Sequence, residues 1–228
     1  MARKRRQDLK DQILLSHLDR FPHVDPRAYV APTATVCGHV VIGANARIMH
    51  GASVIAEGGR IDIGECCIVL ENAVVRSTDR HSTRIGHHCL IGPHAHLVGC
   101  SVEDQVFIAT GAAIFHGAQL GRGSEVRING VVHVKSRLPP GEIVPIGWVA
   151  VGDPISILPP DRHDQIWALQ EPLNFPLVAY GIEREEADMV RITEGLAERL
   201  GSHRADSNRR ADGQAAGQQQ DTGQQQDG

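Results

Sequence analysis

The sequence has few aromatic residues and no apolar run long enough to cross a membrane. Phe, Trp and Tyr make up 4% of the chain, which suits a narrow core filled by Val, Ile and Ala. A membrane-spanning helix needs about 20 mainly apolar residues, so we expect no membrane partner. The basic start, Met1 to Arg6, is followed by polar residues and not by the apolar core of a signal peptide. We therefore expect a cytoplasmic protein.

Strong charge and paired cysteine motifs are also missing. The formal net charge is −4, which gives no electrostatic basis for a nucleic-acid partner. None of the 5 cysteines forms a C-x-x-C pair, so a zinc ribbon or a thioredoxin-like site has no support. Cys67 and Cys89 are expected in the core as small apolar residues, and Cys66 and Cys100 are expected to face outward.

What the chain does contain is an aliphatic residue at every sixth position. A six-residue period fits neither an amphipathic helix nor an alternating strand; it is typical of a parallel β-helix. A small residue follows most anchors four positions later, where a corner leaves little room. Three repeats form one coil, so we expect about six coils. The anchors are Val30, Val36, Ile42, Ile48, Val54, Ile63, Val69, Val75, Ile85, Ile91, Leu97, Val102, Ile108, Ile114, Leu120, Val126, Val132 and Leu138.

Two intervals are longer than six residues, from Val54 to Ile63 and from Val75 to Ile85. Insertions into a solenoid become loops on one face, which is often the binding face. We therefore expect these two insertions to lie near a functional site.

The pattern divides the chain into four parts. Residues 1–22 hold the basic start and a predicted helix from Gln7 to Phe21 that caps the prism. Residues 23–158 form the β-helix domain, mainly β. Residues 159–200 form a helical segment, with helices expected at 161–170 and 182–200, the second carrying an apolar stripe. Residues 201–228 are a polar Gln/Gly-rich tail that cannot bury enough apolar surface to fold.

The stretch from Ile85 to Ala118 resembles the core of the γ-class carbonic anhydrase family. The shared detail is a five-residue step from Leu97 to Val102, followed by regular six-residue repeats. The Gly152-Asp153-Pro154 segment is similar to one that precedes the family's C-terminal helices. The resemblance implies a left-handed β-helix, against the usual handedness of crossovers, and assembly as a homotrimer.

The resemblance also implies where zinc would be held, by three histidines contributed by two subunits. Carried over by register, those positions are Arg76, Pro93 and Val98. Pro and Val side chains cannot ligate a metal, and a cationic Arg repels one. Zinc hydration chemistry needs three ligands and an open position. The sequence therefore predicts a degenerate zinc site, no metal, no cofactor and no conventional carbonic anhydrase activity.

Several histidines nevertheless lie on outward positions of the predicted coils. The most specific hypothesis is a pocket at a subunit interface, lined by Arg76, His94, His96 and His116. The simpler hypothesis is that these are exposed or interface histidines that make ordinary hydrogen bonds. Arg76 and His94 would bind a small ligand, and the cationic Arg76 would suit a carboxylate or a phosphate. His96 and His116 would be the catalytic candidates. The first interpretation is thus a γ-carbonic anhydrase-like trimer that binds a small ligand or serves as a scaffold.

Two alternatives stay open. Many hexapeptide-repeat proteins are acyltransferases acting on acyl-CoA or acyl-carrier thioesters, with an interface histidine as general base. Ala95 to Cys100 is similar to the segment around that histidine. The usual catalytic position falls near Val98 or Gly99, so His96 or His116 would have to act as the base. CoA would then be the cofactor. The other alternative is a metalloenzyme with relocated histidine ligands. The sequence does not settle whether the chain is an enzyme; if it is one, it is an acyltransferase or a carbonic anhydrase-like lyase.

Overall fold

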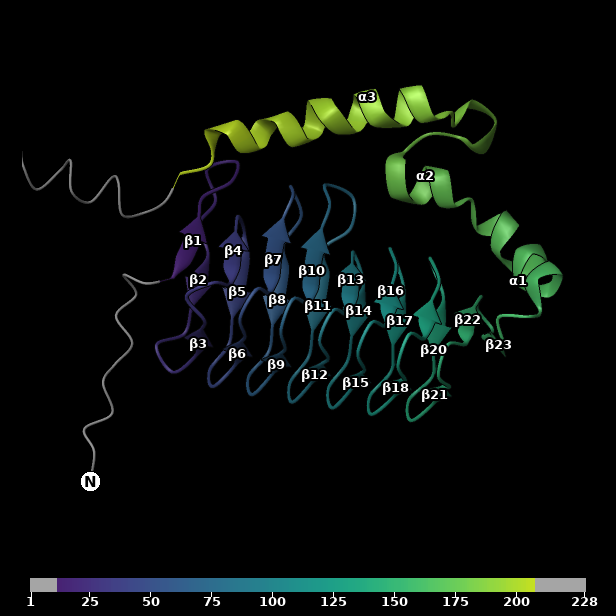
Figure 1. Ribbon diagram of the computed structural model, residues 1–228, viewed down its shortest axis with the longest axis horizontal. Coiled ribbons are helices and arrows are strands. Elements are labelled where there is room, and N and C mark those ends of the chain that lie inside the picture. The colour runs from purple at the N-terminus through teal and green to yellow at the C-terminus, as the bar shows by residue number, and fades with distance from the viewer. Residues whose placement is uncertain (1–11, 208–228) are drawn as a thin grey trace, which may run out of the picture.

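The computed structural model describes residues 12–207, and they form a stack of triangular coils followed by helices (Figure 1). Three sheets run along the stack, and every strand pair is parallel except β22–β23. The first sheet contains β1 (Ile13–Leu15), β4 (Thr35–Cys37), β7 (Ser53–Ala56), β10 (Val74–Ser77), β13 (His96–Val98), β16 (Ala113–Ile114), β19 (Val131–Val132), β22 (Val149–Val151) and β23 (Ser156–Leu158).

The other two sheets each have 7 strands. The second contains β2 (His23–Val24), β5 (Val40–Ile42), β8 (Ile61–Ile63), β11 (Thr83–Ile85), β14 (Ser101–Val102), β17 (Gln119–Leu120) and β20 (Arg137–Leu138). The third contains β3 (Tyr29–Val30), β6 (Arg47–Ile48), β9 (Ile68–Val69), β12 (Leu90–Ile91), β15 (Phe107–Ile108), β18 (Glu125–Val126) and β21 (Ile143–Val144).

The predicted left-handed parallel β-helix is confirmed. Every predicted anchor is no more than 4% exposed, and the anchors form one continuous core. Each coil buries its apolar residues only against the coils next to it, as in other solenoids. The stack has about eight turns where the sequence predicted about six. The difference arises because coils begin before Val30, with β1 and β2, and continue past Leu138 through the buried Val144 and Ala150.

The predicted core thiols Cys67 and Cys89 are buried, as expected, but the prediction that Cys100 faces outward was wrong. The step from Leu97 to Val102 is one residue short, so the small inward position two residues before the next anchor falls on Cys100. Ser101 is exposed in its place. The short step therefore moves the sequence register without interrupting the core.

The helix predicted from Gln7 to Phe21 is also wrong over the described residues. Ile13–Leu15 is strand β1, and a turn follows at His17 to Arg20. β1 pairs in parallel with β4, with Leu14 opposite Val36. Backbone pairing with an existing sheet edge outweighs the helical spacing of the leucines, because it satisfies the edge strand's hydrogen bonds. Residues 7–11 lie outside the described residues.

The C-terminal segment contains α1 (His163–Gln170), η2 (Glu171–Leu173), α2 (Phe175–Tyr180), η3 (Arg184–Glu186), α3 (Met189–Leu200) and η4 (Gly201–Ala205). α1 matches the expected first helix, whereas the second begins at Met189 and not at residue 182. Asp188 fixes that start by accepting a hydrogen bond from the Arg191 backbone at 2.8 Å. In Figure 1, α3 runs back along the coils toward β1.

The tail boundary at residue 201 was placed too early. Gly201–Ala205 forms η4, and the backbone of Ser16 donates to the carbonyl of Ser207 at 2.9 Å. These contacts hold the segment, so its polarity does not prevent it from ordering; residues 208–228 lie outside the described residues. Among residues 12–207, no helix is long and apolar enough to span a membrane.

Candidate functional site

A cavity of about 640 Å³ lies between the first sheet and the C-terminal segment. β10 and β13 contribute Arg76, His96 and Val98, and Phe115 and His116 follow β16. Helices α2 and α3 close the other side. Known ligand pockets span about 300–1,000 Å³ and are mainly apolar with a few polar groups, so the cavity has the size and composition of a small-molecule site.

Both insertions in the repeat border this cavity. The first contributes Glu57 and Gly58, and the second contributes Thr78 and Asp79. The two loops lie against each other: a Cβ built on Gly58 would be 3.1 Å from the Asp79 Cα. The extra residues therefore form one raised edge of the pocket.

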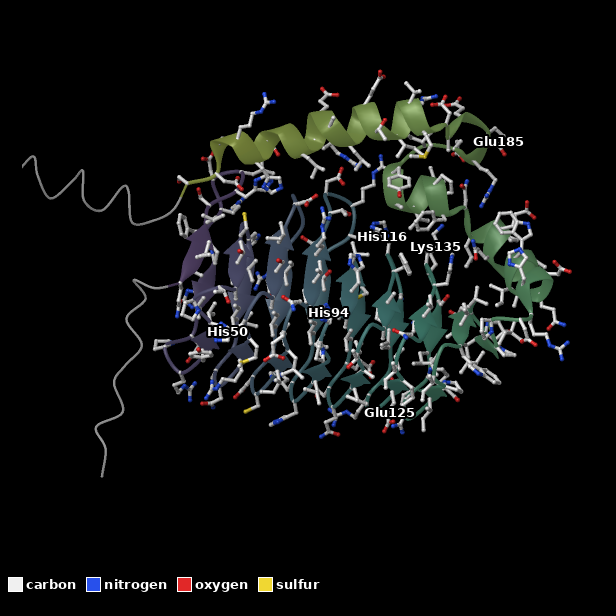
Figure 2. All side chains as sticks on the ribbon, viewed as in Figure 1. His50, His94, His116, Glu125, Lys135 and Glu185 are labelled. Atoms are coloured by element: carbon white, nitrogen blue, oxygen red, sulfur yellow. The ribbon has the colours of Figure 1, made fainter. Side chains whose placement is uncertain are left out.

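The structure brings together three of the four residues predicted for the pocket. Arg76 and His96 lie in adjacent strands, where Arg76 is paired in register with Val98. His116 lies one coil further, beside the C-terminal helices, in the labelled view of Figure 2. All three line the cavity within a single chain, so their assembly needs no second subunit.

His94 is not part of this pocket. It is exposed and occupies the corner between β12 and β13, with a φ of 58°. Figure 2 shows it on the flank of the stack, away from the C-terminal helices. His94 was included in the predicted interface pocket because it is next to Pro93, and within one chain the corner places it on a different side of the prism from His96.

The pocket histidines are held as neutral imidazoles. Burial, together with smaller contributions from nearby His81, His96 and Arg76, lowers the pKa of His116 to about 4. Burial, followed by the charge of Arg76, also lowers the pKa of His96. Both rings are therefore uncharged at neutral pH, and a neutral imidazole has one nitrogen that donates and one that accepts.

One of these imidazoles has an unused polar atom. His116 is 8% exposed, and its Nδ1 is buried with no hydrogen-bond partner among the described residues. Its ring meets His81 edge-on at a centroid distance of 5.6 Å. A buried polar atom without a partner costs about 1–3 kcal/mol, so a ligand that supplied one would gain that interaction.

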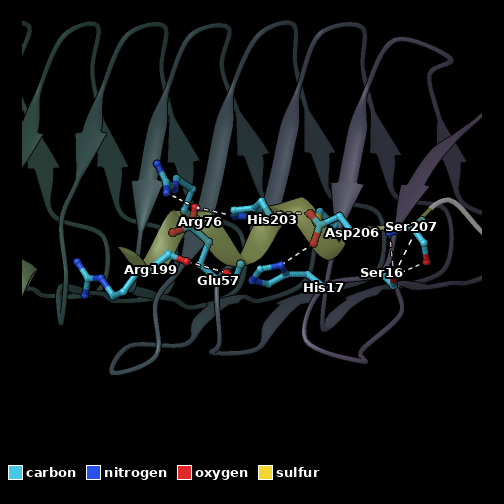
Figure 3. Close-up of polar contacts among 10 residues, drawn as sticks. Ser16, His17, Glu57, Arg76, Arg199, His203, Asp206 and Ser207 are labelled. Atoms are coloured by element: carbon cyan, nitrogen blue, oxygen red, sulfur yellow. Dashed lines mark hydrogen bonds and ion pairs between the residues drawn. The ribbon is translucent and has the colours of Figure 1, made fainter. Parts of the chain in front are cut away.

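Arg76 is not a free cation. Its guanidinium forms an ion pair with the carboxylate of Glu57 from the first insertion. Glu57 Oε1 is also 3.8 Å from His203 Nε2 in η4. Arg76 therefore lies in a chain of polar contacts (Figure 3), and an anionic ligand would compete with Glu57 for it.

Sequence reasoning missed the aromatic wall of the pocket. The Phe175 ring of α2 packs on Phe115 at a centroid distance of 6.0 Å and on Tyr180 at 5.8 Å. The available signal was Asn174, which caps α2 by accepting a hydrogen bond from the Leu177 backbone, followed by Pro176 in the first turn. Phe175 and Tyr180 thus add apolar surface from α2 to the lining of the pocket.

The positions implied for zinc do not fit a metal. Arg76 is paired with Glu57, Val98 is an apolar side chain 5% exposed, and Pro93 lies on the corner beside His94. Nor do relocated histidines fill the gap. Within residues 12–207, His96 and His116 belong to no group of three or more converging ligand atoms. No catalytic step through a metal follows from this pocket.

Comparison with known proteins supports the predicted resemblance. The chain is 32% identical over 145 residues to mitochondrial gamma carbonic anhydrase 1 of Arabidopsis thaliana, covering 61% of this chain and 53% of the relative. It is 29% identical over 105 residues to the carnitine operon protein CaiE of Escherichia coli strain K12, covering 46% and 54%. No family model matches the chain. The chain spans about half the length of the curated relatives it matches.

Among solved structures, a hexapeptide transferase family protein from Anaplasma phagocytophilum is 27% identical, with a TM-score of 0.45, over 71% of this chain and 92% of that one. The curated relatives confirm that the sequence is similar to the γ-carbonic anhydrases.

Proposed function

We propose that this γ-carbonic anhydrase-like chain lacks conventional zinc-dependent hydration of carbon dioxide and binds a small organic molecule in the pocket beneath the C-terminal helices. The unpartnered Nδ1 of His116, buried in a cavity of ligand size, is the observation that carries the proposal. Phe115, Phe175 and Val98 would pack on an apolar body. A polar group of the ligand would reach His116 and His96.

The ligand's polar group is proposed to be an acid. Arg76 lines the same cavity, and a guanidinium binds carboxylate or phosphate through two parallel hydrogen bonds. Glu57 holds that guanidinium when no ligand competes. A carboxylate would therefore compete with Glu57 for the guanidinium, and a displaced Glu57 would keep His203 Nε2, 3.8 Å away, as its neighbour.

The test is a thermal-shift screen of the purified protein against small carboxylates, phosphates and uncharged alcohols. We expect an apolar carboxylic acid to stabilise the wild type, and we expect His116→Gln and Arg76→Gln each to weaken its binding about tenfold or more. His94→Gln, on the exposed corner, is the matched control. Equal shifts in wild type, His116→Gln and Arg76→Gln would refute the pocket, and hydration of carbon dioxide by zinc-supplemented protein would refute the first half of the proposal.

A second candidate function is acyl transfer from a CoA or carrier thioester. It is favoured by the neutral imidazoles of His96 and His116, one of which has a nitrogen free to accept a proton. Against it, a pKa of about 4 makes His116 a weak base, since general bases work best near the operating pH. Thioester cleavage with short acyl-CoAs decides: activity that survives both His96→Ala and His116→Ala rules out this base mechanism.

We also propose that the chain assembles as a homotrimer. The support is the resemblance to the γ-carbonic anhydrases, and the pocket itself is complete within one chain. Native mass spectrometry of the full chain tests it: a mass of three subunits is expected, and a monomer at micromolar concentration would contradict it.

A further inference from the structure

Four side chains of metal-binding types converge where η4 and the residues after it meet the first coils. Three of them, His17, His203 and Asp206, are labelled in Figure 3. His17 follows β1, Cys37 ends β4, His203 lies in η4, and Asp206 follows it. His17 is 4% exposed and Cys37 is 1% exposed. These four residues are separate from the positions implied for zinc by the family resemblance, and the sequence gives no short motif for them.

The carboxylate of Asp206 is at the centre of this cluster. Its Oδ1 accepts a hydrogen bond from His17 Nδ1 at 2.7 Å. Its Oδ2 accepts from His203 Nδ1 at 2.7 Å and from Cys37 Sγ at 3.3 Å. One potential ligand atom from each residue lies within 4.8 Å of all the others. Zinc bonds of about 2.0–2.3 Å in a tetrahedron place ligand atoms roughly 3.3–3.8 Å apart, so small side-chain movements would close the set around an ion.

Charge and donor chemistry point to the same kind of ion. The His17 and His203 rings stack at a centroid distance of 4.1 Å. A divalent cation with one thiolate and one carboxylate has no net charge, which suits a largely buried site. Imidazole and thiolate ligands favour zinc over magnesium or calcium. Zinc binds the thiolate form of cysteine, so the ion would displace the Cys37 proton on binding.

An outer carboxylate completes the arrangement. Glu57 Oε1 lies 3.8 Å from His203 Nε2, the ring nitrogen that faces away from Asp206. Metal-bound histidines usually present their second nitrogen to such a group, which fixes the ring orientation. Glu57 is in turn paired with Arg76 in the ligand pocket, so the cluster adjoins the pocket without sharing its histidines.

We propose that His17, Cys37, His203 and Asp206 form a zinc site that clamps the C-terminal segment onto the first coils. Four protein ligands fill a tetrahedral centre, which is the pattern of a structural site and not of a catalytic one. The clamp joins residues far apart in sequence and holds α3 over the pocket. The proposal does not depend on the identity of the pocket's ligand.

The test begins with the full chain, stripped with a chelator and titrated with zinc in a competition assay. We expect one equivalent bound per chain. Loss of an outer-shell partner costs about 10–100-fold in metal affinity, so Cys37→Ser and His203→Gln should each cost about 100-fold or more, and Glu57→Gln about 10–100-fold. Cys66→Ser is the matched control, since Cys66 is a thiol outside the cluster.

Two further measurements separate a site from incidental binding. Cobalt loaded in place of zinc should give a thiolate charge-transfer band in the wild type and in Cys66→Ser, but not in Cys37→Ser. Zinc should also slow trypsin cleavage at Arg199 and Arg204 in the wild type and not in His203→Gln.

Less than about half an equivalent in the wild type, or unchanged affinity in His203→Gln, overturns the proposal and leaves a clamp made by hydrogen bonds alone. Circular dichroism checks that each variant is folded. If Cys37→Ser, a change in a buried position, does not fold, His203→Gln at the half-buried end of the cluster decides the outcome.

Discussion

The β-helix and the C-terminal segment are stabilised in different ways. The core and the apolar residues packed against it extend from Leu14 to Ile157, and no described residue beyond Ile157 joins them. In the C-terminal segment only Ile166 and Val178 are buried apolar residues, and α3 has none. Each coil adds buried apolar surface to the stack, whereas α3 is held at its end by a few polar contacts. We therefore expect the coils to supply most of the free energy of unfolding, and we expect the C-terminal segment to open locally while the coils stay folded.

The largest expected effect is in the core. Leu97→Ala and Ile114→Ala, both at 0% exposure, should each lower the free energy of unfolding by about 2–5 kcal/mol, because each leaves a cavity that the stacked coils cannot close. Leu90→Ala is the control at 36% exposure and should cost well under half as much. Urea unfolding measures all three. Equal losses at Leu90 and Leu97 would show that the predicted inward register is wrong.

The register explains why the coils were predictable. A buried aliphatic residue at each sixth position is a local signal that survives in one sequence, and it fixes which residues face inward. It failed at the first strand, because Ile13–Leu15 takes its structure from pairing with β4 in the next coil. Local helical spacing cannot report such a partner.

The site was predictable only in part for the same reason. Arg76, His96 and His116 lie on successive coils, so the period alone placed them on one face. His94 lies outside the single-chain pocket because it occupies a corner, the third position after an anchor, where a positive φ recurs along the stack. Cys37 and Asp206 are 169 residues apart, and no pattern within a repeat links them.

A smaller effect is expected at the short step that shapes the pocket. Gly99 has a φ of +58°, and an added Cβ would lie 2.5 Å from the Cβ of His81. Gly123 has a φ of +68° with nothing within 4 Å. Both alanine variants carry the strain of a positive φ, about 1 kcal/mol or more, but only Gly99→Ala adds a clash with His81.

We therefore expect Gly99→Ala to lose about 1–3 kcal/mol more than Gly123→Ala in urea unfolding, and to weaken binding in the pocket. Equal losses in the two variants would mean that His81 moves to make room for a Cβ at residue 99. The close packing of His81 on Gly99 would then not constrain this side of the pocket.

The pH dependence of stability tests whether the segment really buries His116. In the folded chain its pKa is about 4, against an ordinary value of 6.5. Between these values the unfolded chain binds a proton that the folded chain does not, so stability falls as pH falls from about 6.5 to about 4. His116→Gln should make this dependence shallower.

NMR titration gives the direct measurement. The His116 ring should stay neutral down to about pH 5, since burial disfavours its charged form. Protonation near pH 6.5 would instead mean that water reaches the ring and that the helices do not close the pocket in solution.

The smallest effect on overall stability is expected at the start of α3. This change best separates the stability of the C-terminal segment from that of the β-helix. Asp188→Ala removes the cap on the Arg191 backbone and should cost about 1 kcal/mol of helix stability. Because α3 adds nothing to the core, amide hydrogen exchange should quicken in α3 and stay unchanged in the strands.

Asp188→Ser keeps a capping oxygen and should restore protection. Asp164→Ala, in the first turn of α1 where no side chain makes a capping hydrogen bond, is the control. Faster exchange in β10 or β13 would show that the segment supports the coils as well as covering them, and the two regions would then form one cooperative unit.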